Sequence, residues 1–406
     1  MKPWRTPYPK FGNGPGLVRV QAVAARLGVD LQAFGRSGAV IVGSNGKGST
    51  AAMTAALLQQ AEGGAVGLFT SPHMLDLNER FRIGGEDISD AELGVHWRRV
   101  VDAVDAAGLA AQMGGFEFLF LVAADWFAAR GCAHTVWEAG LGGRLDPTRL
   151  IEARAVALTS LDLEHTDLLG ATLEAIALEK AAVAPAGASL WMGECIDATV
   201  AAPLQRWCDA HEVSLAAAPP LPWRPPLAGA HQARNGALAL QLARALACVD
   251  DEKAQAGLAA VRWPGRLERL SADPLVVIDV GHTPAAIAAA LEGFAAMRGE
   301  REAVLVCGAS VDKDAEAMVA LLAASFSTIV CAAPRHKGAP AAEIAAYALR
   351  ANSAAEVSVA DSVSEARQIA LARARGGAIY AAGGLFLASE FKAAHLGRDP
   401  ASLVFF

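Results

Sequence analysis

The chain has 406 residues, of which 53% are hydrophobic and 19% charged, so its composition is that of a folded protein with a large core and excludes global disorder. Its length predicts two or three domains. The formal net charge of −7 gives no electrostatic basis for binding nucleic acid or an anionic membrane, so we expect neither partner, and any phosphate site must be local.

Six cysteines are scattered without C-x-x-C spacing: Cys132, Cys195, Cys208, Cys248, Cys307 and Cys331. This spacing argues against a zinc site or a disulfide framework and indicates free thiols in a reducing compartment. The first residues lack the apolar core of a signal peptide, and no run of about 18 uninterrupted apolar residues occurs, so the sequence supports neither secretion nor membrane insertion. We expect a cytoplasmic protein.

The N-terminal part of the chain contains a phosphate-loop pattern. The spacing of apolar residues over 17–27 predicts an amphipathic helix. An apolar run, 38–42, then leads into the segment 43–50 (GSNGKGST), and the helix-forming residues 51–58 follow. A strand, a glycine-rich turn and a helix start together offer backbone N–H groups and a positive dipole end, which suit a polyphosphate.

Two kinds of side chain in this loop fit the same purpose. Lys47 would place a positive charge near the terminal phosphates, and Ser49 or Thr50 would offer Mg²⁺ a hydroxyl group. Because glycine is common where a strand turns into a helix, an ordinary βα turn is the alternative interpretation.

Strands and helices alternate downstream of the loop. Apolar runs predict strands at 66–70, 134–137 and 155–160, with a buried helix at 116–129 between the first two. Glu138 follows the second of these strands directly, and Asp162 and His165 lie near the end of the third. The alternation predicts a parallel α/β sheet, in which polar groups at strand ends converge at the carboxyl edge.

The second half of the chain repeats the α/β pattern. Prolines clustered between 219 and 226 predict a loop, and a helix is expected from 231 to about 248. Further strands are predicted at 275–279, 303–308, 328–331 and 377–380. We therefore expect a boundary at about 269–274 and two domains, 1–270 and 271–406.

Glu138, His165 and Lys180 are the polar residues that could act beside a phosphate loop. Mg²⁺ held against phosphates needs oxygen or imidazole ligands, which Glu138 and His165 could supply. Each residue could equally be structural: a lysine after a glutamate on a helix, as in Glu179-Lys180, is usually a solvated ion pair. His73 could be a loop-packing residue, and the polar clusters at 264–268 and 279–284 could be hinge segments.

Taken together, these stretches resemble the folylpolyglutamate synthase/dihydrofolate synthase family of the Mur ligase superfamily over nearly the whole chain. The matching segments are 43–50, 69–73 with Glu79-Arg80, Phe116-Glu117, 138–146, 165–167, 176–181, His231-Gln232 with Asn235, 264–266, Asp279 with His282 and Pro284, and 312–314. The G-K-G-S-T form of the loop favours the folate branch, because peptidoglycan ligases of the superfamily usually have G-K-T-T there.

The resemblance implies a fold and a reaction. The fold would be a P-loop-containing central Mur-ligase-type domain with a parallel sheet, followed by a smaller Rossmann-like α/β domain that binds the amino acid and closes over ATP. The activity would be that of an ATP-dependent amide ligase: a carboxylate attacks the γ-phosphate of ATP to give an acyl phosphate, and the amine of L-glutamate displaces phosphate.

The resemblance also assigns roles to individual residues. Nucleotide contacts fall to Asn45, Gly46, Lys47, Gly48, Ser49, Thr50, Asn235, Arg266, Asp279 and His282. Two Mg²⁺ ions would be held by Ser49, Ser71, Glu138 and His165. Catalytic roles fall to Lys47, His165 and Lys180, the last matching a lysine that the family carries as a carbamate. The pterin side of the substrate is expected near Phe116, Glu117, Leu145, Asp146 and Pro147.

Three departures from the family pattern concern the substrates. The segment 279–284 has His-Thr-Pro in place of the usual His-Asn-Pro, Val18 replaces a glutamate, and Pro147-Thr148 replaces an alanine-threonine pair. We expect a monomeric ligase that joins L-glutamate to dihydropteroate, to a reduced folate, or to both. A ligase for a non-folate carboxylate and a nucleotide-binding protein without ligase activity are the alternatives.

Overall fold

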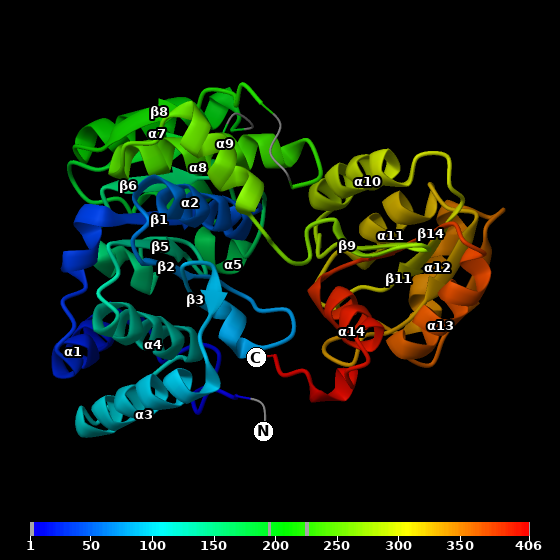
Figure 1. The fold of residues 1–406 in the computed structure, drawn as a ribbon, viewed down its shortest axis with the longest axis horizontal. Helices are drawn as coiled ribbons and strands as arrows, with labels where there is room; N and C mark the ends of the chain where they lie inside the picture. Colours follow the sequence, from blue (N-terminus) through cyan, green and yellow to red (C-terminus); the bar gives the residue numbers. More distant parts are fainter. Residues whose placement is uncertain (1–3, 194–195, 224–226, 406) are drawn as a thin grey trace.

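The chain folds into two α/β units that lie side by side (Figure 1). The computed structural model describes residues 4–193, 196–223 and 227–405, so Cys195, Pro225 and Pro226 lie outside the described residues. The first unit is built on an eight-stranded sheet and the second on a six-stranded sheet. The α/β class predicted from the alternation of strands and helices is therefore confirmed.

The first sheet has the strand order β4-β3-β2-β5-β1-β6-β7-β8 and is parallel except at β3, which is antiparallel to both of its neighbours, β2 and β4. Its strands are β1 Gly38–Val42, β2 Val66–Phe69, β3 Phe81–Ile83, β4 Glu86–Asp87, β5 His134–Glu138, β6 Ala155–Leu158, β7 Ser189–Met192 and β8 Ser214–Ala217. In the register, Ile41 lies beside Glu138 and Val42 beside Leu158. The phosphate loop after β1 therefore lies between the ends of β5 and β6.

Helices cover both faces of this sheet because each face carries an apolar cluster. One face packs against α2 Lys47–Glu62, α8 His231–Leu246 and α9 Asp251–Ala260. The other packs against α1 Leu17–Leu27, α3 Asp90–Ala106, α4 Gly115–Ala129 and α7 Ala198–Ala210. The shorter elements are α5 Thr166–Leu169, α6 Leu173–Ala181 and the 3₁₀ turns η1 Gln32–Ser37, η2 Leu77–Arg80 and η3 Pro147–Ile151.

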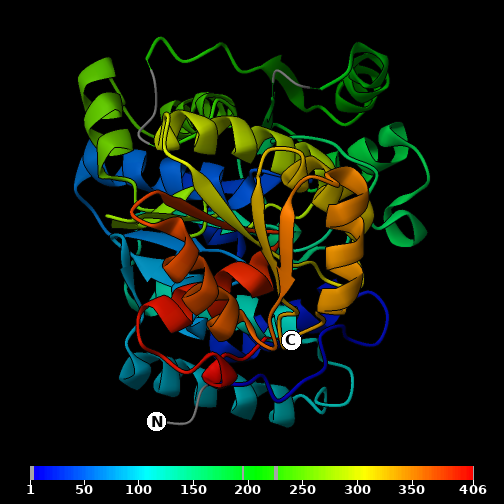
Figure 2. The ribbon, with the colours of Figure 1, turned by 90° about the vertical axis from the view of Figure 1, so that its right-hand side faces the viewer.

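The second sheet has the order β13-β12-β11-β14-β10-β9, and only β9 in it is antiparallel to its neighbour. Its strands are β9 Glu268–Ala272, β10 Leu275–Ile278, β11 Ala303–Cys307, β12 Thr328–Cys331, β13 Glu356–Val359 and β14 Ala378–Ala382. Figure 2 shows these strands between two groups of helices. The helices are α10 Pro284–Arg298, α11 Ala315–Ala323, α12 Ala341–Ala351, α13 Val363–Ala374 and α14 Leu385–His395.

Two segments connect the units. Residues 261–267 lead from α9 to β9, and after α14 and the turn η4 Pro400–Ser402 the chain returns to the first unit (Figure 1). The second sheet begins at Glu268, and the domain boundary at 270 stays a prediction. None of the helices in the described part of the chain has the length and apolar run needed to cross a bilayer.

Candidate functional site

The phosphate loop has the backbone shape that its glycines allow. Gly43 has φ of 141° and Gly46 has φ of 90°, values that favour glycine over residues with a Cβ. Gly46 precedes the first residue of α2, so the N-terminal N–H groups of a sixteen-residue helix face the loop. The predicted strand, turn and helix start are therefore present, with the dipole end of α2 beneath the loop.

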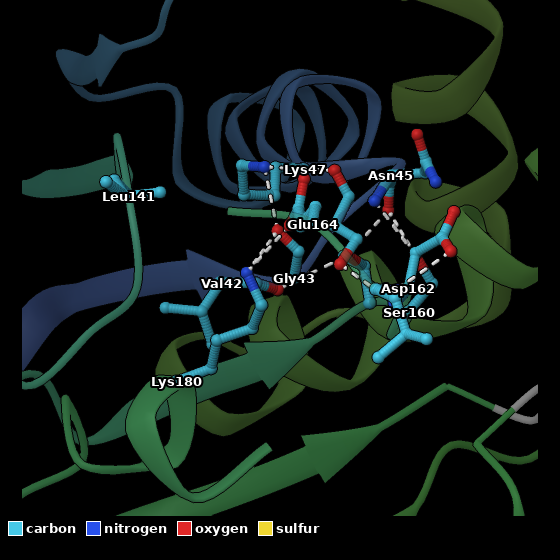
Figure 3. A network of polar contacts seen from close by, with 12 residues as sticks. Val42, Gly43, Asn45, Lys47, Leu141, Ser160, Asp162, Glu164 and Lys180 are labelled. Atoms are coloured by element: carbon cyan, nitrogen blue, oxygen red, sulfur yellow. Dashed lines mark hydrogen bonds and ion pairs between the residues drawn. The ribbon is translucent and has the colours of Figure 1, made fainter. Parts of the chain in front are cut away.

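The end of β6 holds this loop in place (Figure 3). The backbone N–H of Asn45 donates to Oγ of Ser160 at 2.9 Å, and Oγ1 of Thr159 donates to the carbonyl of Asn45 at 2.7 Å. The N–H of Ser44 donates to the carbonyl of Ser160 at 2.9 Å. These bonds fix the backbone of residues 44 and 45 against the segment that follows β6.

Two lysines converge on one carbonyl oxygen of the loop. Nζ of Lys47 lies 2.8 Å and Nζ of Lys180 lies 3.2 Å from the carbonyl oxygen of Gly43 (Figure 3). Lys180 also pairs with Oε1 of Glu164 at 3.0 Å and is only 2% exposed, so the solvated ion-pair interpretation is wrong. Burial is the main cause that lowers the pKa of Lys180, and the positive charge of Lys47 lowers it further. The carboxylate of Glu164 opposes this shift.

Ser49 and Thr50 begin α2 with hydroxyl groups that have no partner among the described residues. Both side chains are at least 99% buried. A buried hydroxyl group without a hydrogen bond costs free energy. Two such groups in the first turn of the helix that follows a phosphate loop indicate a binding site in which a ligand would supply the missing partner. An ion between Ser49 and a phosphate would satisfy Oγ, and the residues present therefore fit a divalent metal.

Glu138, at the end of β5, provides a carboxylate beside the same loop. It is 4% exposed, and its Oε2 accepts from the N–H of Ser71 at 2.8 Å. Oε2 lies 3.4 Å from the position that a Cβ on Gly48 would occupy, so the carboxylate is close to the first turn of α2. Burial raises the pKa of Glu138, although Lys47 and the Ser71 N–H oppose the rise.

The role of His165, the fourth predicted metal ligand, stays a prediction. His165 is exposed and has φ of 48° at the start of α5. Burial lowers its pKa, and Glu164 opposes that effect. Across residues 4–193, 196–223 and 227–405, no three His, Cys, Asp or Glu side chains form a cluster that could hold a metal. A metal here would therefore need hydroxyl and ligand oxygens beside Glu138, and Ser49 and Ser71 offer hydroxyl groups.

Most of the predicted nucleotide residues line one cavity between the two units. The cavity has a volume of about 340 Å³, and its lining includes Asn45, Gly46, Ser49, Asn235, Arg266, Asp279 and His282. Asp279 is buried, and its two oxygens accept from the N–H groups of Leu267 at 3.0 Å and Gly281 at 2.7 Å. Asp279 thus fixes the linker to β10, which positions Arg266 at the cavity wall.

A smaller cavity of about 80 Å³ shares Arg266 and His282 with the first and reaches Ser71 and Glu138. Sequence reasoning missed two of its lining residues, Arg82 and Trp263. The guanidinium of Arg82 lies 5.1 Å from the centre of the Trp263 ring, and Cζ2 of Trp263 lies 2.9 Å from a Cβ position on Gly48. No local pattern marks this contact, because the tryptophan comes from the linker and the arginine from β3.

The predicted pterin residues are largely engaged in structural contacts. Glu117 accepts from the N–H of Gly114 at 3.0 Å and pairs with Arg19 at 2.6 Å. Asp146 is 4% exposed and accepts from the N–H groups of Gly140, Leu141 and Thr148, whereas Pro147 is buried in the first turn of η3. Among the five, Leu145 is 41% exposed and Phe116 is partly exposed, and their substrate roles stay predictions.

Comparison with known proteins identifies the family. Residues 265–384 match the Mur ligase glutamate ligase domain. The dihydrofolate synthase/folylpolyglutamate synthase of Bacillus subtilis is 34% identical over 67% of this chain and 70% of that protein. The chain belongs to the folylpolyglutamate synthase/dihydrofolate synthase family. A probable bifunctional folylpolyglutamate synthase/dihydropteroate synthase of Halobacterium salinarum is 35% identical over 94% of the chain, which spans 49% of that relative.

Solved structures of this family have the same fold. Folylpolyglutamate synthase of Mycobacterium tuberculosis, complexed with ADP and AMPPCP, superposes with a TM-score of 0.86 at 27% identity, covering 95% of this chain and 96% of the other. The bifunctional synthase of Yersinia pestis, complexed with AMPPNP and a manganese ion, gives a TM-score of 0.81 at 28% identity, covering 95% and 93%.

The hydrogen bonds of Asp146 predict a structural role that can be measured. Asp146→Asn would place an NH₂ group opposite the N–H donors of Gly140, Leu141 or Thr148, and we expect the free energy of unfolding to fall by about 2–3 kcal/mol. Chemical denaturation checks this, with Asp167→Asn, an exposed carboxylate, as the control that should change little. Equal stability of the two variants would contradict the structural role.

Proposed function

We propose that the protein is an ATP-dependent ligase that joins L-glutamate to dihydropteroate, to a reduced folate, or to both. One observation supports this most: the phosphate loop, with its unpartnered Ser49 hydroxyl, opens into a cavity whose other wall comes from the second unit. A second cavity shares Arg266 and His282 with it and is also lined by Glu138 and Ser71. Two substrates can therefore approach one phosphate from different sides.

The nucleotide would occupy the larger cavity with its phosphates on the loop. The N–H groups at the start of α2 and the amine of Lys47, which now bonds the Gly43 carbonyl, would take the phosphate charge. Asn235, Arg266 and Asp279 line the remaining wall, where the rest of the nucleotide would lie. The relatives solved with ADP, AMPPCP and AMPPNP support this placement.

Catalysis would proceed in two displacements. An oxygen of the acceptor carboxylate attacks the γ-phosphorus, the bond to ADP breaks, and an acyl phosphate forms. The amine of L-glutamate then attacks the acyl carbon, the C–O bond to phosphate breaks, and the amine loses a proton. Arg82, Arg266 and His282 line the cavity where carboxylates would meet the phosphate, and enclosure between the units would keep water from the acyl phosphate.

A divalent metal fits the loop, and the manganese ion in the Yersinia pestis relative supports one. Ser49, Ser71, Glu138 and His165 would hold it, and two ions follow from the family pattern only. When bound, the metal would neutralise phosphate charge during transfer. Burial disfavours the ionised form of Glu138, whereas the positive charge of the metal would favour it.

The identity of the acceptor is the least constrained part of the proposal. The names of the relatives favour a folate. Val18, which replaces the family glutamate, is 82% exposed, and Glu117 is already paired with Arg19. These departures keep a non-folate carboxylate as the alternative acceptor, and a cytoplasmic location and a monomeric state remain predictions from the sequence.

One assay separates the alternatives. Purified protein with ATP, Mg²⁺ and L-glutamate is scored for phosphate release, with dihydropteroate and tetrahydrofolate in parallel reactions. We expect release that depends on at least one of the two acceptors. Release with neither would rule out the folate acceptors, and absence of turnover with any carboxylate tested would favour a binding protein without ligase activity.

Glu138→Gln tests the metal site. Glutamine keeps the size of the side chain and an acceptor for the Ser71 N–H but loses the charge, so we expect the fold to persist and Mg²⁺-dependent turnover to fall by about 100-fold or more. Steady-state rates and the thermal unfolding midpoint are measured together. Glu62→Gln, a half-exposed carboxylate paired with His134, is the matched control; near-normal turnover of the Glu138 variant would refute the assignment.

Lys180 tests the proposed carbamate. Only the neutral amine reacts with CO₂, and because the pKa of Lys180 is lowered, the neutral form is present at a lower pH than for an ordinary lysine. With ¹³C-bicarbonate we expect one carbamate ¹³C resonance that Lys180→Met removes. A spectrum without that resonance in the wild type, recorded together with ADP and Mg²⁺, would count against the carbamate.

A further inference from the structure

The segment 398–405, here called the strap, runs from the second unit back to the first (Figure 1). The guanidinium of Arg398 bonds both carboxylate oxygens of Asp76, at 2.7 and 2.8 Å. The carbonyl oxygen of Val404 lies 2.7 Å from Nε2 of His73, and the ring of Phe405 stacks on the His73 ring with centres 5.6 Å apart. The strap therefore contacts the loop that follows Ser71 through an ion pair, a hydrogen bond and a stacked pair of rings.

That loop is already embedded in the second unit. Met74 and Leu75 pack in the apolar cluster formed by β10, β11, α13 and α14. The carboxylate of Glu79 accepts from the N–H groups of Met74, Leu75 and Asp76, at 2.8 to 3.0 Å, which makes the loop compact. The position of residues 71–76 thus depends on the orientation of the second unit.

His73 links the strap to Arg80. Nε of Arg80 donates to Nδ1 of His73 at 2.9 Å, and since an arginine N–H can only donate, Nδ1 must be the accepting nitrogen. Nε2 of His73 then carries the proton and donates to Val404. His73 is 3% exposed and Arg80 is 4% exposed, so both bonds are shielded from water and hold each ring and guanidinium in one orientation.

The chain of contacts ends at the proposed metal carboxylate. The buried Arg80 guanidinium lies close enough to Glu138 for the carboxylate charge to stabilise the cation, and Glu138 is bonded to the N–H of Ser71, two residues before His73. Glu138 thus interacts with the charge of Arg80 and with the N–H of Ser71 at the start of the loop that the strap contacts.

We propose that the strap, acting through His73, positions Arg80 and Ser71 against Glu138, so that the carboxylate is correctly placed only when the second unit has the orientation seen here. His73 is then a positioning residue for the ligase, a role that rests on the proposed function. An exposed ion pair such as Arg398 with Asp76 contributes little stability by itself, whereas the buried bonds of His73 fix direction. These contacts couple the orientation of the second unit to the geometry of the proposed metal site.

Two conservative variants of His73 separate its bonds. The amide of Asn can replace Nδ1 and keep the bond from Arg80, and the longer amide of Gln can replace Nε2 and keep the bond to Val404. We expect each to lower kcat about tenfold with a smaller effect on the KM for ATP, because both bonds are needed. Wild-type kcat in either variant would overturn the two-bond linkage. His96→Gln, a buried histidine bonded to Asp125, controls for loss of any buried imidazole.

A second measurement does not depend on turnover. Binding of Mn²⁺ in the presence of ADP is followed by electron paramagnetic resonance for Arg398→Ala and Phe405→Ala, which alter only the strap. We expect both to weaken Mn²⁺ binding about tenfold while the unfolding midpoint changes little. Arg350→Ala, which breaks the exposed Arg350–Glu316 pair, is the matched control and should bind like wild type.

The outcomes distinguish the two proposals. Unchanged Mn²⁺ affinity in both strap variants, or wild-type protein that binds no Mn²⁺ with ADP, would overturn the positioning role. Mn²⁺ binding that depends on the strap in a protein without ligase turnover would retain this inference and refute the proposed function.

Discussion

The carbonyl oxygen of Gly43 accepts hydrogen bonds from two lysine amines, those of the buried Lys180 and the partly buried Lys47, and the site depends on this concentration of positive charge. Lys47 and Lys180 repel each other, and the carboxylate of Glu164 pairs with Lys180 at 3.0 Å. Charge of one sign in a low-dielectric region is costly unless an anion balances it. A polyphosphate on the loop, or a negative group on Lys180, would lower that cost, so the arrangement of the two amines favours binding of an anion.

The parts of this site that the sequence predicts share one property: they follow from local pattern plus the geometry of parallel sheets. The loop at 43–50 is specified by a strand, glycines and a helix start. Glu138 could be placed beside it because β5 and β1 are neighbours and parallel strands end at one edge. The same reasoning does not specify the position of His165, because this residue lies in the loop after β6 and not at the end of the strand, and its role stays a prediction.

Other features could not be predicted because they come from packing between distant segments. The strands β7, β8, β9 and β13 were missed, since they are short and only partly buried and lack a clear apolar run. Trp263 meets Arg82 and Gly48 only after the linker has folded against the first unit. Asp146 was expected near the substrate, but its carboxylate accepts hydrogen bonds from three backbone N–H groups. These bonds form only in the folded chain, so the sequence does not show them.

The orientation of the units is what turns these parts into one site. Arg266 and His282 belong to the linker and the second unit, yet they line both cavities with residues of the first. A rotation of the second unit would remove them from the phosphate loop and would also pull on Met74, Leu75 and the strap. Those segments end beside Ser71, whose N–H bonds Glu138. In the proposed positioning role, the orientation of the second unit therefore sets both the wall of the nucleotide cavity and the placement of the carboxylate, because residues 71–76 contact both units.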